Sequence, residues 1–417
     1  MIFKDQTKSI PITKMMVWEA YKKVKSNKGS AGVDRQSLED FEANRSKELY
    51  KLWNRMASGS YFPPAVKRVS IPKTDGKKRP LGIPTVSDRV AQQVVKTYLE
   101  PRLESEFLDV SYGYRPDKNA IAAVNEVRMN VQKYHWVIDL DIQAFFDNVD
   151  HELIMKALKR HVSENWILFY ITRWLKAPVQ LPEGKIQLTT GKGTPQGGVI
   201  SPLLANLFMH YCVDKWMQVH YPQVKLVRYA DDLIIHCRTY EETYQVLTSL
   251  KQRLSACGLT AHPEKTKLVY CKKSGRNRKG YPVQFDFLGF SFRPIHMKLK
   301  RGGSFLQFDC IMSRKSKVRL TRVLRDLKFH NKSQHTIQDL AILLNPKIRG
   351  WLNYYGRIHR RCMKPVFYYL HHRLIKWILN KYKRFKRSKV KAVRWLRHIC
   401  NCYPNLFYHW TLGYQLT

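Results

Sequence analysis

Residues 226–236 read Leu-Val-Arg-Tyr-Ala-Asp-Asp-Leu-Ile-Ile-His, and this stretch decides how the rest of the chain is interpreted. Two apolar runs flank a short polar centre, which is the pattern of a β-hairpin with a tight turn. The adjacent carboxylates of Asp231 and Asp232 repel each other unless water or cations lie beside them. The pair is either an ordinary solvated turn, in which Asp is common, or an oxygen-rich site for the divalent ions that phosphoryl transfer uses.

Composition and charge narrow the class of protein. At 417 residues, with 44% hydrophobic and 12% aromatic residues, the chain is large and apolar enough for an ordered protein of two or three domains. Its 74 Lys and Arg against 32 Asp and Glu leave a formal net charge of +42, which favours nucleic acid as the partner before a membrane surface. Because no apolar run approaches the roughly 20 residues of a membrane span and the start lacks a signal-peptide core, we expect a cytoplasmic protein without a membrane partner. The eight cysteines lack zinc-site spacing and are expected to be reduced thiols.

The N-terminal quarter of the chain carries helical patterns and a hairpin. A helix is expected over 38–56, and another over 87–106 with Ser87 as its N-cap. Between them, residues 66–72 and 79–84 are expected to form two short strands joined by a basic turn. Basic side chains on that turn suit a triphosphate or a nucleic-acid backbone, and an ordinary solvated turn has the same pattern.

Residues 136–142 predict a strand with two acids on one face. Asp139 and Asp141 are two positions apart and share a face, whereas the apolar residues between and beside them share the other. Acids inside an apolar strand are unfavourable to bury without partners. One of them is therefore expected to meet the hairpin carboxylates across a sheet; the alternative is an edge strand with one face in water.

Residues 193–198 contain Gln196-Gly197-Gly198 in front of a predicted long helix. Ser201 suits the N-cap of that helix and Pro202 its first turn. Capping therefore leaves Gln196 and the two glycines unexplained. Paired glycines let a backbone approach a ligand closely, and Gln offers both donors and an acceptor.

The C-terminal part changes in composition. Residues 285–292 alternate as one strand, and from about Arg293 onward helices are expected over 315–329, 337–344, 346–358, 365–385 and 390–399. No Asp or Glu follows Asp339, whereas Lys and Arg continue to Arg397. A charge run is usually a solvated face, but an acid-free region favours phosphate contacts. The order of elements predicts an α+β fold with an antiparallel sheet and helices on one of its faces, followed by an all-helical region.

Taken together, these motifs resemble those of the reverse transcriptase/maturase proteins encoded by group II introns, in the form that lacks the C-terminal HNH endonuclease domain. Each block alone is weak, but their order along almost the whole chain is a strong signal. The blocks are residues 71–73 with 79–84, 111–116, 141–147, 194–198, 229–232, 288–290 and 348–355. The resemblance implies a right-hand polymerase, with an N-terminal extension and fingers over 1–125, a palm over 126–295, a helical thumb or maturase domain over 296–386, and a short basic nucleic-acid-binding segment over 387–417.

The resemblance also implies an RNA-directed DNA polymerase that adds deoxynucleotides to a primer 3′-hydroxyl. Its catalytic and metal-binding residues would be Asp141, Asp231 and Asp232, with Ile142 as a further ligand through its backbone and Asp139 as the runner-up for the first position. The implied cofactors are two Mg²⁺ ions, for which Mn²⁺ can substitute. One ion would lower the pKa of the hydroxyl and the other would steady the pyrophosphate.

The remaining implied residues fall into two groups. Phe146 would clash with a ribose 2′-hydroxyl, with Phe145 as the alternative, and Lys265 would protonate pyrophosphate. The nucleotide-binding residues would be Lys73, Arg79, Phe146, Gln196, Gly197 and Lys265. The RNA- and DNA-binding residues would be Arg115, Lys347, Arg349, Arg357, Arg360 and Arg361.

The implied partners are group II intron RNA, an RNA template with a DNA primer, target DNA and deoxynucleoside triphosphates; the oligomeric state stays open. Binding the intron RNA would promote its splicing and mobility. Two other functions fit the same residues: a splicing-only RNA-binding maturase, and an intron-free relative that acts in repair or defence. An RNA-dependent RNA polymerase is disfavoured by Phe146.

Overall fold

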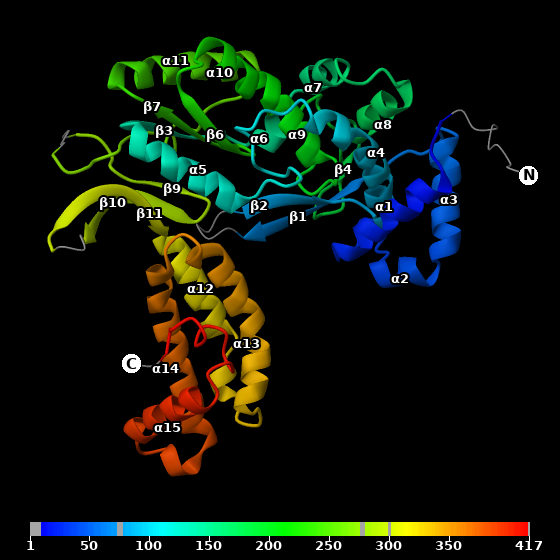
Figure 1. Cartoon of the computed structure of the whole chain (residues 1–417). Helices are drawn as coiled ribbons and strands as arrows, with labels where there is room; N and C mark the ends of the chain where they lie inside the picture. Colours follow the sequence, from blue (N-terminus) through cyan, green and yellow to red (C-terminus); the bar gives the residue numbers. More distant parts are fainter. Residues whose placement is uncertain (1–9, 73–77, 276–279, 299–301, 416–417) are drawn as a thin grey trace, which may run out of the picture. The chain divides into compact units, whose positions relative to one another are not determined.

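The computed structural model describes residues 10–72, 78–275, 280–298 and 302–415 (Figure 1). The chain forms two compact units, the first from residues 1–123 and 136–268 and the second from residues 124–135 and 269–417. The predicted α+β class, with an antiparallel sheet and a helical C-terminal region, is confirmed. The four expected domain ranges do not coincide with the two units, and that finer division stays a prediction.

Three helices begin the first unit. The expected helix over 38–56 is wrong in one respect, because it breaks at Asn44 into two helices. Ser37 and Asp40 form a capping box at the start of the first of these. The three helices are α1 (Lys14–Ser26), α2 (Leu38–Ala43) and α3 (Arg45–Ala57).

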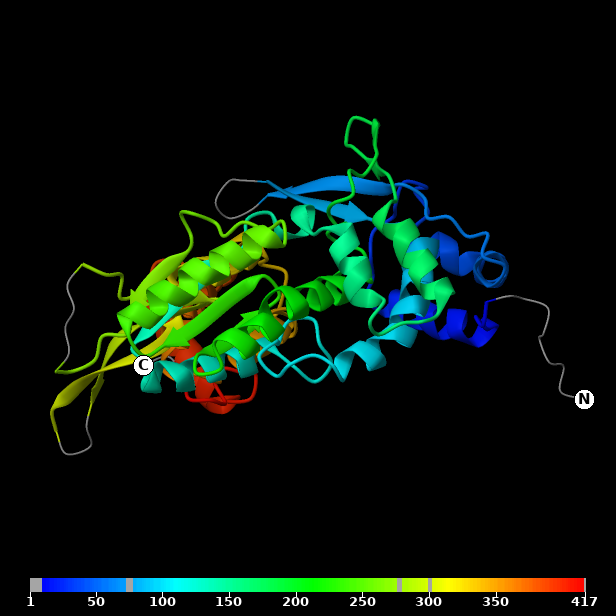
Figure 2. The same cartoon turned by 90° about the horizontal axis from the view of Figure 1, so that it is seen from above.

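The predicted basic hairpin is confirmed as β1 (Val66–Pro72) and β2 (Lys78–Ile83), an antiparallel pair. The turn that joins the two strands, residues 73–77, lies outside the described residues. β1 also pairs in parallel with β4 (Val179–Gln180), which pairs with β5 (Ile186–Gln187). In Figure 2 this short green hairpin lies beside the blue strands of β1 and β2.

Helix α4 (Val86–Glu104) follows, and its N-cap is Thr85 rather than the expected Ser87. The Thr85 hydroxyl accepts a hydrogen bond from the Asp88 amide at 3.2 Å, as an N-cap does for the third helical residue. Ser87 is already inside the first turn, so the expected cap was two residues late.

The central sheet has the order β6-β7-β3-β8. Its strands are β6 (Lys225–Tyr229), β7 (Asp232–Cys237), β3 (Trp136–Asp141) and β8 (Lys267–Tyr270). Both predicted strands, 136–142 and the hairpin around 231, are confirmed. α11 (Tyr240–Ala256) packs on β3 and β7 (Figure 1). The other helices of this unit are α6 (Phe145–Asn148), α7 (His151–Leu158), α8 (Asn165–Leu175), α9 (Ser201–Met209), the π-helical turn η1 (His210–Asp214) and α10 (Lys215–His220).

In the second unit, the expected single strand over 285–292 is wrong. It is a hairpin of β9 (Phe285–Phe287) and β10 (Phe290–Lys298), with Phe287 opposite Phe290. Leu288 and Gly289 form the turn with positive φ values of 47° and 82°. β10 then pairs with β11 (Ser304–Met312), so strands continue where the change at Arg293 suggested helices.

Helices complete the second unit. The two helices expected over 337–344 and 346–358 are one helix, α13, with Pro346 inside it. The helices are α5 (Ala120–Lys133), which begins in the first unit, α12 (Arg314–Asp326), α13 (Ile337–Trp351), the π-helical η3 (Leu352–Gly356), α14 (Lys364–Lys381) and α15 (Lys389–Cys402), with 3₁₀ turns η2 (Phe329–Asn331), η4 (Arg360–Met363) and η5 (Lys383–Phe385). Among the described residues, none of the helices has the length and apolarity to cross a membrane.

Candidate active site

The buried side chain of Arg228 stabilises the turn of the acidic hairpin formed by β6 and β7. The strands leave Ala230 and Asp231 as the turn, and Ala230 has a left-handed backbone with φ 57°, which costs a non-glycine residue about 1–2 kcal/mol. The fully buried Arg228 guanidinium donates to the Ala230 carbonyl at 3.0 Å. It also donates twice to the buried Asp214 carboxylate, at 2.8 and 2.6 Å. A buried ion pair therefore fixes the turn.

The segment 111–116 gives a second support. The Tyr112 amide donates to the Arg228 carbonyl at 2.8 Å, and the Ser111 hydroxyl accepts from the Arg228 guanidinium at 2.8 Å. A Cβ on Gly113 would lie 2.6 Å from the Ala230 nitrogen, so only glycine leaves room for the turn. This block therefore acts as the packing partner of the acidic hairpin.

Strand register brings the predicted aspartates together. β3 and β7 are antiparallel neighbours, and Asp141 lies directly opposite Asp232, next to the turn residue Asp231. Asp139 lies opposite Ile234 instead, two residues or about 7 Å farther along the strand. The geometry favours Asp141 over Asp139 as the third member of the cluster.

The electrostatics of the cluster are those of crowded carboxylates. Asp232 reaches solvent, yet protein surrounds it on most sides, and this burial, together with the charges of Asp231 and Asp141, raises its pKa to about 7. Burial, with the charge of Asp141 added, also raises the pKa of Asp231. A cation beside the three carboxylates would relieve their mutual repulsion.

The donor set fits a divalent metal ion of the Mg²⁺ class. Carboxylate and carbonyl oxygens are the ligands that such ions prefer. The bridge between Ile142 and Ala261 uses the Asp141 carbonyl and the Gln143 amide, and not the Ile142 carbonyl that the resemblance implies as a further ligand. Within the described residues, no three Asp, Glu, His or Cys side chains converge as a complete metal site. Binding would therefore need the side chains of the cluster to turn toward the ion.

Lys265 lies at the cluster and pairs with one of its members. Its ammonium donates to a carboxylate oxygen of Asp141 at 2.5 Å. The backbone after α11 sets this position, since the His262 amide donates to the Asp141 carbonyl at 2.7 Å. Lys265 is more than half exposed, so it can leave Asp141 without being drawn from a buried site.

Four of the predicted nucleotide-binding residues lie in or beside the loop that precedes α9. The Arg79 guanidinium donates to the Gln196 side-chain oxygen at 2.8 Å, and the Gly82 amide donates to the Gln196 carbonyl at 2.6 Å. Gly197 has φ 119°, and a Cβ there would lie 2.3 Å from the Gly82 carbonyl oxygen, so the loop requires glycine at this position. The positive charge of Arg79 partly offsets the rise that burial causes in the pKa of Asp231, which links this loop to the acidic cluster.

A cavity of about 250 Å³ adjoins this loop, lined by Arg68, Gly82, Phe146 and Gln196 among others. Phe145, the alternative to Phe146, is not among the lining residues and packs edge-on against Phe208 in the core. The structure thus brings together Arg79, Phe146, Gln196 and Gly197. Lys265 lies apart from them and pairs with Asp141. Lys73 lies outside the described residues.

Gln92 is a site residue that the sequence reasoning missed. From α4, its side-chain oxygen accepts hydrogen bonds from the amides of Val199 and Ile200 at 2.7 and 3.2 Å. Its amide group donates to the buried Asp88 carboxylate at 2.9 Å. Ile200, not the expected Ser201, is the N-cap of α9, because Gln92 replaces a local cap. The sequence signal that could have identified Gln92 is its position: it is a polar residue four positions after Asp88, on the buried face of α4.

The predicted nucleic-acid contacts divide into exposed and buried residues. Arg115 does not fit the expectation: it is buried, and its guanidinium is taken up by Glu104 and by the carbonyls of Leu108 and Ser111. Its environment is that of a structural residue. The other five predicted residues lie in the second unit. Four of them are exposed, namely Arg349, Arg357, Arg360 and Arg361, and Lys347 is half-buried.

Comparison with known proteins gives two family matches. The profile of the family described as reverse transcriptase (RNA-dependent DNA polymerase) matches residues 71–292. The profile of the group II intron, maturase-specific domain matches residues 318–395. The first match spans more than half of the chain and includes the acidic cluster and the loop before α9.

Individual relatives agree with these matches. The chain is 37% identical over 199 residues to protein YkfC of Escherichia coli, covering 46% of this chain and 52% of the relative. It is 34% identical over 194 residues to the group II intron-encoded protein LtrA of Lactococcus lactis, covering 46% and 32%. A putative COX1/OXI3 intron 1 protein of Saccharomyces cerevisiae is 24% identical over 451 residues, covering 90% and 53%. The chain thus spans about half or less of the length of these relatives.

Proposed function

Because the chain belongs to the reverse transcriptase (RNA-dependent DNA polymerase) family and carries a group II intron maturase-specific domain, we propose that it is an RNA-directed DNA polymerase that also binds a group II intron RNA to promote splicing and mobility. The observation that carries the polymerase proposal is the register that sets Asp141 opposite Asp232 and beside Asp231. Its substrates would be deoxynucleoside triphosphates and a DNA primer on an RNA template.

Each part of the site has a role in this proposal. The three aspartates and the Ile142 carbonyl would hold divalent ions, Mg²⁺ first, which when bound lower the pKa of the primer 3′-hydroxyl and neutralise the pyrophosphate. Arg79 would grip the triphosphate while Gln196 fixes its guanidinium. Lys265 would turn from Asp141 toward the leaving group and give it a proton. Such a site works by positioning and electrostatics.

The test of the proposal is primer extension on an RNA template with Mg²⁺, comparing deoxynucleotides with ribonucleotides. Deoxynucleotide-dependent extension would support it. Protein that is folded and binds intron RNA but does not extend a primer would instead favour the splicing-only maturase, the second candidate suggested by the maturase-specific domain.

Replacing Phe146 with valine should weaken the choice of sugar. The Phe146 ring lines the cavity beside Gln196, so shortening it would admit a ribose 2′-hydroxyl. We expect the ratio of kcat/KM for deoxynucleotide over ribonucleotide to fall by about 10- to 100-fold, the scale that one pocket contact sets. Phe145→Leu is the matched control, because that ring packs in the core; an unchanged ratio in Phe146→Val together with a lowered ratio in Phe145→Leu would reverse the assignment.

Removing the Gln92 side-chain amide should loosen the loop that carries Gln196. In Gln92→Leu the amides of Val199 and Ile200 lose their acceptor, so the loop is no longer held. We expect kcat/KM for the incoming nucleotide to fall by about tenfold, since small misplacements have large effects on positioning. Gln93→Leu is the control, because the Gln93 side chain bonds within α4, to Thr97, and no bond to the loop before α9 is found among the described residues. Equal losses in the two variants would mean that helix stability, not the loop, is responsible.

The exposed arginines that follow α13 should contribute to RNA binding through phosphate contacts. For Arg357→Ala, Arg360→Ala and Arg361→Ala combined, we expect the slope of log K against log salt to become shallower by about 2–3, at roughly 0.7–0.9 per lost contact. The same three positions changed to lysine keep their charge and should keep the slope. An unchanged slope in the alanine variant would remove these arginines from the interface.

A further inference from the structure

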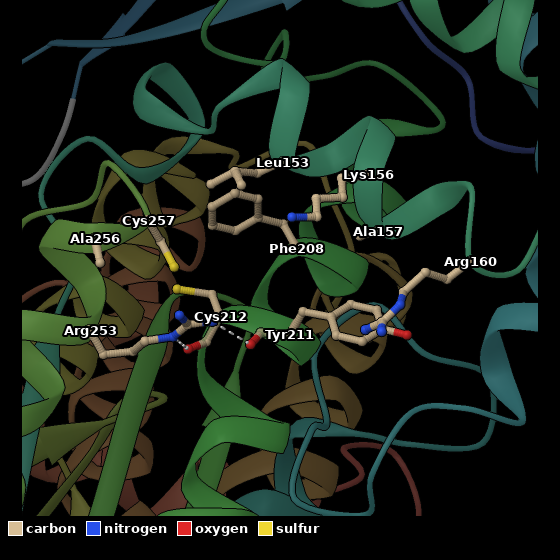
Figure 3. A pocket seen from close by; sticks show the side chains of 10 residues that line it. All are labelled: Leu153, Lys156, Ala157, Arg160, Phe208, Tyr211, Cys212, Arg253, Ala256 and Cys257. Carbon is tan, nitrogen blue, oxygen red and sulfur yellow. Dashed lines mark hydrogen bonds between the residues drawn. The ribbon is translucent and has the colours of Figure 1, made fainter.

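A second cavity in the first unit, of about 410 Å³, brings two cysteine side chains face to face (Figure 3). Cys212 comes from η1, and Cys257 is the residue that ends α11, which packs against η1. Figure 3 shows their sulfur atoms pointing toward each other. Both residues are largely buried but line the cavity, so a small molecule that enters it reaches the sulfur atoms.

The cavity is strongly basic. Its lining, which lies wholly within the described part of the chain, includes Lys156, Arg160 and Arg253 and no acid. Arg253 is fixed in place, because it donates to the carbonyls of Cys212 and Tyr211, each at 3.1 Å. The Arg160 guanidinium lies 5.4 Å from the centre of the Tyr211 ring. A ligand that carries carboxylates is therefore favoured over a neutral or cationic one.

The two thiols are chemically unequal. The interaction with the neighbouring Cys212 thiol, with the nearby charge of Arg253, lowers the pKa of Cys257 to about 7 against the effect of burial. The same interaction and burial raise the pKa of Cys212. Cys257 is thus the thiol that becomes a nucleophile near neutral pH, and Cys212 is placed to attack it afterwards.

A metal site is a poorer explanation of the same pair. Among the described residues, no His, Asp, Glu or third Cys joins the two sulfur atoms to form a group that could hold a metal ion. Zinc sites use four ligands when structural and three when catalytic. Thiol chemistry is what this geometry allows.

We propose that Cys212 and Cys257 form a reversible disulfide by exchange with an anionic low-molecular-weight disulfide that enters this basic cavity. The Cys257 thiolate attacks one sulfur of the small disulfide and expels one thiolate, leaving a mixed disulfide. Cys212 then loses its proton and attacks the Cys257 sulfur, expelling the second small thiolate. Both expelled thiolates take up the protons that the two cysteines release, so one small disulfide is reduced to two thiols as the protein dithiol is oxidised.

The bond would join two segments that support the acidic cluster. Asp214, two residues after Cys212, holds Arg228 and through it the turn at Ala230. The backbone that follows Cys257 reaches His262, which donates to the Asp141 carbonyl. The chemical proposal is nevertheless independent of polymerase activity, and its test needs no nucleic acid.

The size of the expected effect identifies the useful comparison. A lowered pKa raises the thiolate fraction of Cys257 at neutral pH but also lowers the nucleophilicity of the thiolate, so the two effects on the reaction rate partly cancel. The positive charges of the cavity should have a larger effect on the rate of reaction with an anionic disulfide than the lowered pKa has. We therefore compare oxidised glutathione, which is anionic, with bis(2-hydroxyethyl) disulfide, which is neutral.

The experiment uses the full chain with Cys402→Ser, which removes the one cysteine among the described residues whose side chain is exposed. After reaction, free thiols are alkylated and the digest is analysed without reduction. We expect a Cys212–Cys257 linked peptide, and in Cys212→Ala a trapped Cys257–glutathione adduct. Lys156→Gln with Arg160→Gln should slow the reaction with oxidised glutathione by about three- to tenfold and leave the neutral disulfide unaffected.

Three results would overturn the proposal: no linked peptide from folded protein, an adduct on Cys212 instead of Cys257, or equal slowing with both disulfides. Cys257→Ser serves as the matched control, since it leaves Cys212 without a partner and should leave it unmodified. Circular dichroism of each variant separates a lost reaction from a lost fold.

Discussion

Asp231→Asn combined with Asp232→Asn is expected to lower primer extension by at least about 10³-fold while the protein stays folded. Asparagine keeps the shape of each side chain but removes the charges that would hold divalent ions. The fold should not suffer, because burial and mutual repulsion already disfavour the ionised forms, which is why the pKa values of both carboxyls are raised. The melting temperature without divalent ions should equal or exceed that of the unmodified protein. Extension that survives the double substitution would refute the assignment of the cluster.

The same assay decides between the two candidates on β3. Asp141 lies opposite Asp232, whereas Asp139 lies opposite Ile234, so Asp141→Asn should resemble the double variant and Asp139→Asn should keep extension within about tenfold. These are matched substitutions two residues apart on one face of one strand. If Asp139→Asn abolished extension and Asp141→Asn did not, the register argument would be wrong.

The sequence alone predicted those parts of the site where local pattern and tertiary structure agree. Alternation identified β3, and two apolar runs around Asp231 and Asp232 identified the hairpin, because a strand with one buried face must alternate. Opposite placement of Asp141 and Asp232 depends in addition on the register in which these two strands pair. Pairing itself is not a local property, so only the family resemblance or the structure could favour Asp141 over Asp139.

Predictions failed where distant groups replace local ones. Ser201 was expected to cap α9, but the amides at its start are satisfied by Gln92 from another helix. Pro346 was expected to begin a new helix after a break, yet α13 continues through it while the neighbouring Asn345 bonds to Leu406 and Tyr408. Such contacts join residues far apart in sequence, which a periodicity argument does not detect.

The prediction of a single strand over 285–292 was wrong for a different reason. A two-residue turn at Leu288 and Gly289 shifts the phase of the buried aromatic residues, so that Phe287 pairs with Phe290 instead of continuing one strand. Such turns usually carry Asn-Gly or Asp-Gly, and leucine with positive φ is uncommon. Here the packing of the four phenylalanines of the hairpin overrides the turn preference. The side chains concerned are Phe285, Phe287, Phe290 and Phe292.

Arg228→Met is expected to destabilise the first unit by about 3–5 kcal/mol, because it leaves a buried charge without its partner. Arg228 and Asp214 are fully buried, and the guanidinium also donates to Asn206, Ser111 and the Ala230 carbonyl. With the 5–15 kcal/mol typical of a folded domain, this loss is a large part of the total. Urea unfolding measures it.

A double-mutant cycle separates the charge from the packing. Arg228→Met combined with Asp214→Leu removes both charges, so it should be less destabilised than Arg228→Met alone by roughly 1–4 kcal/mol. Polymerase activity should not recover in the double variant, because the Ala230 carbonyl still lacks the donor that holds the turn. Recovery of stability without activity would place the role of Arg228 in the shape of the acidic hairpin. Recovery of both stability and activity would mean that the turn keeps its left-handed residue without Arg228. Arg228 would then not be needed to shape the acidic hairpin.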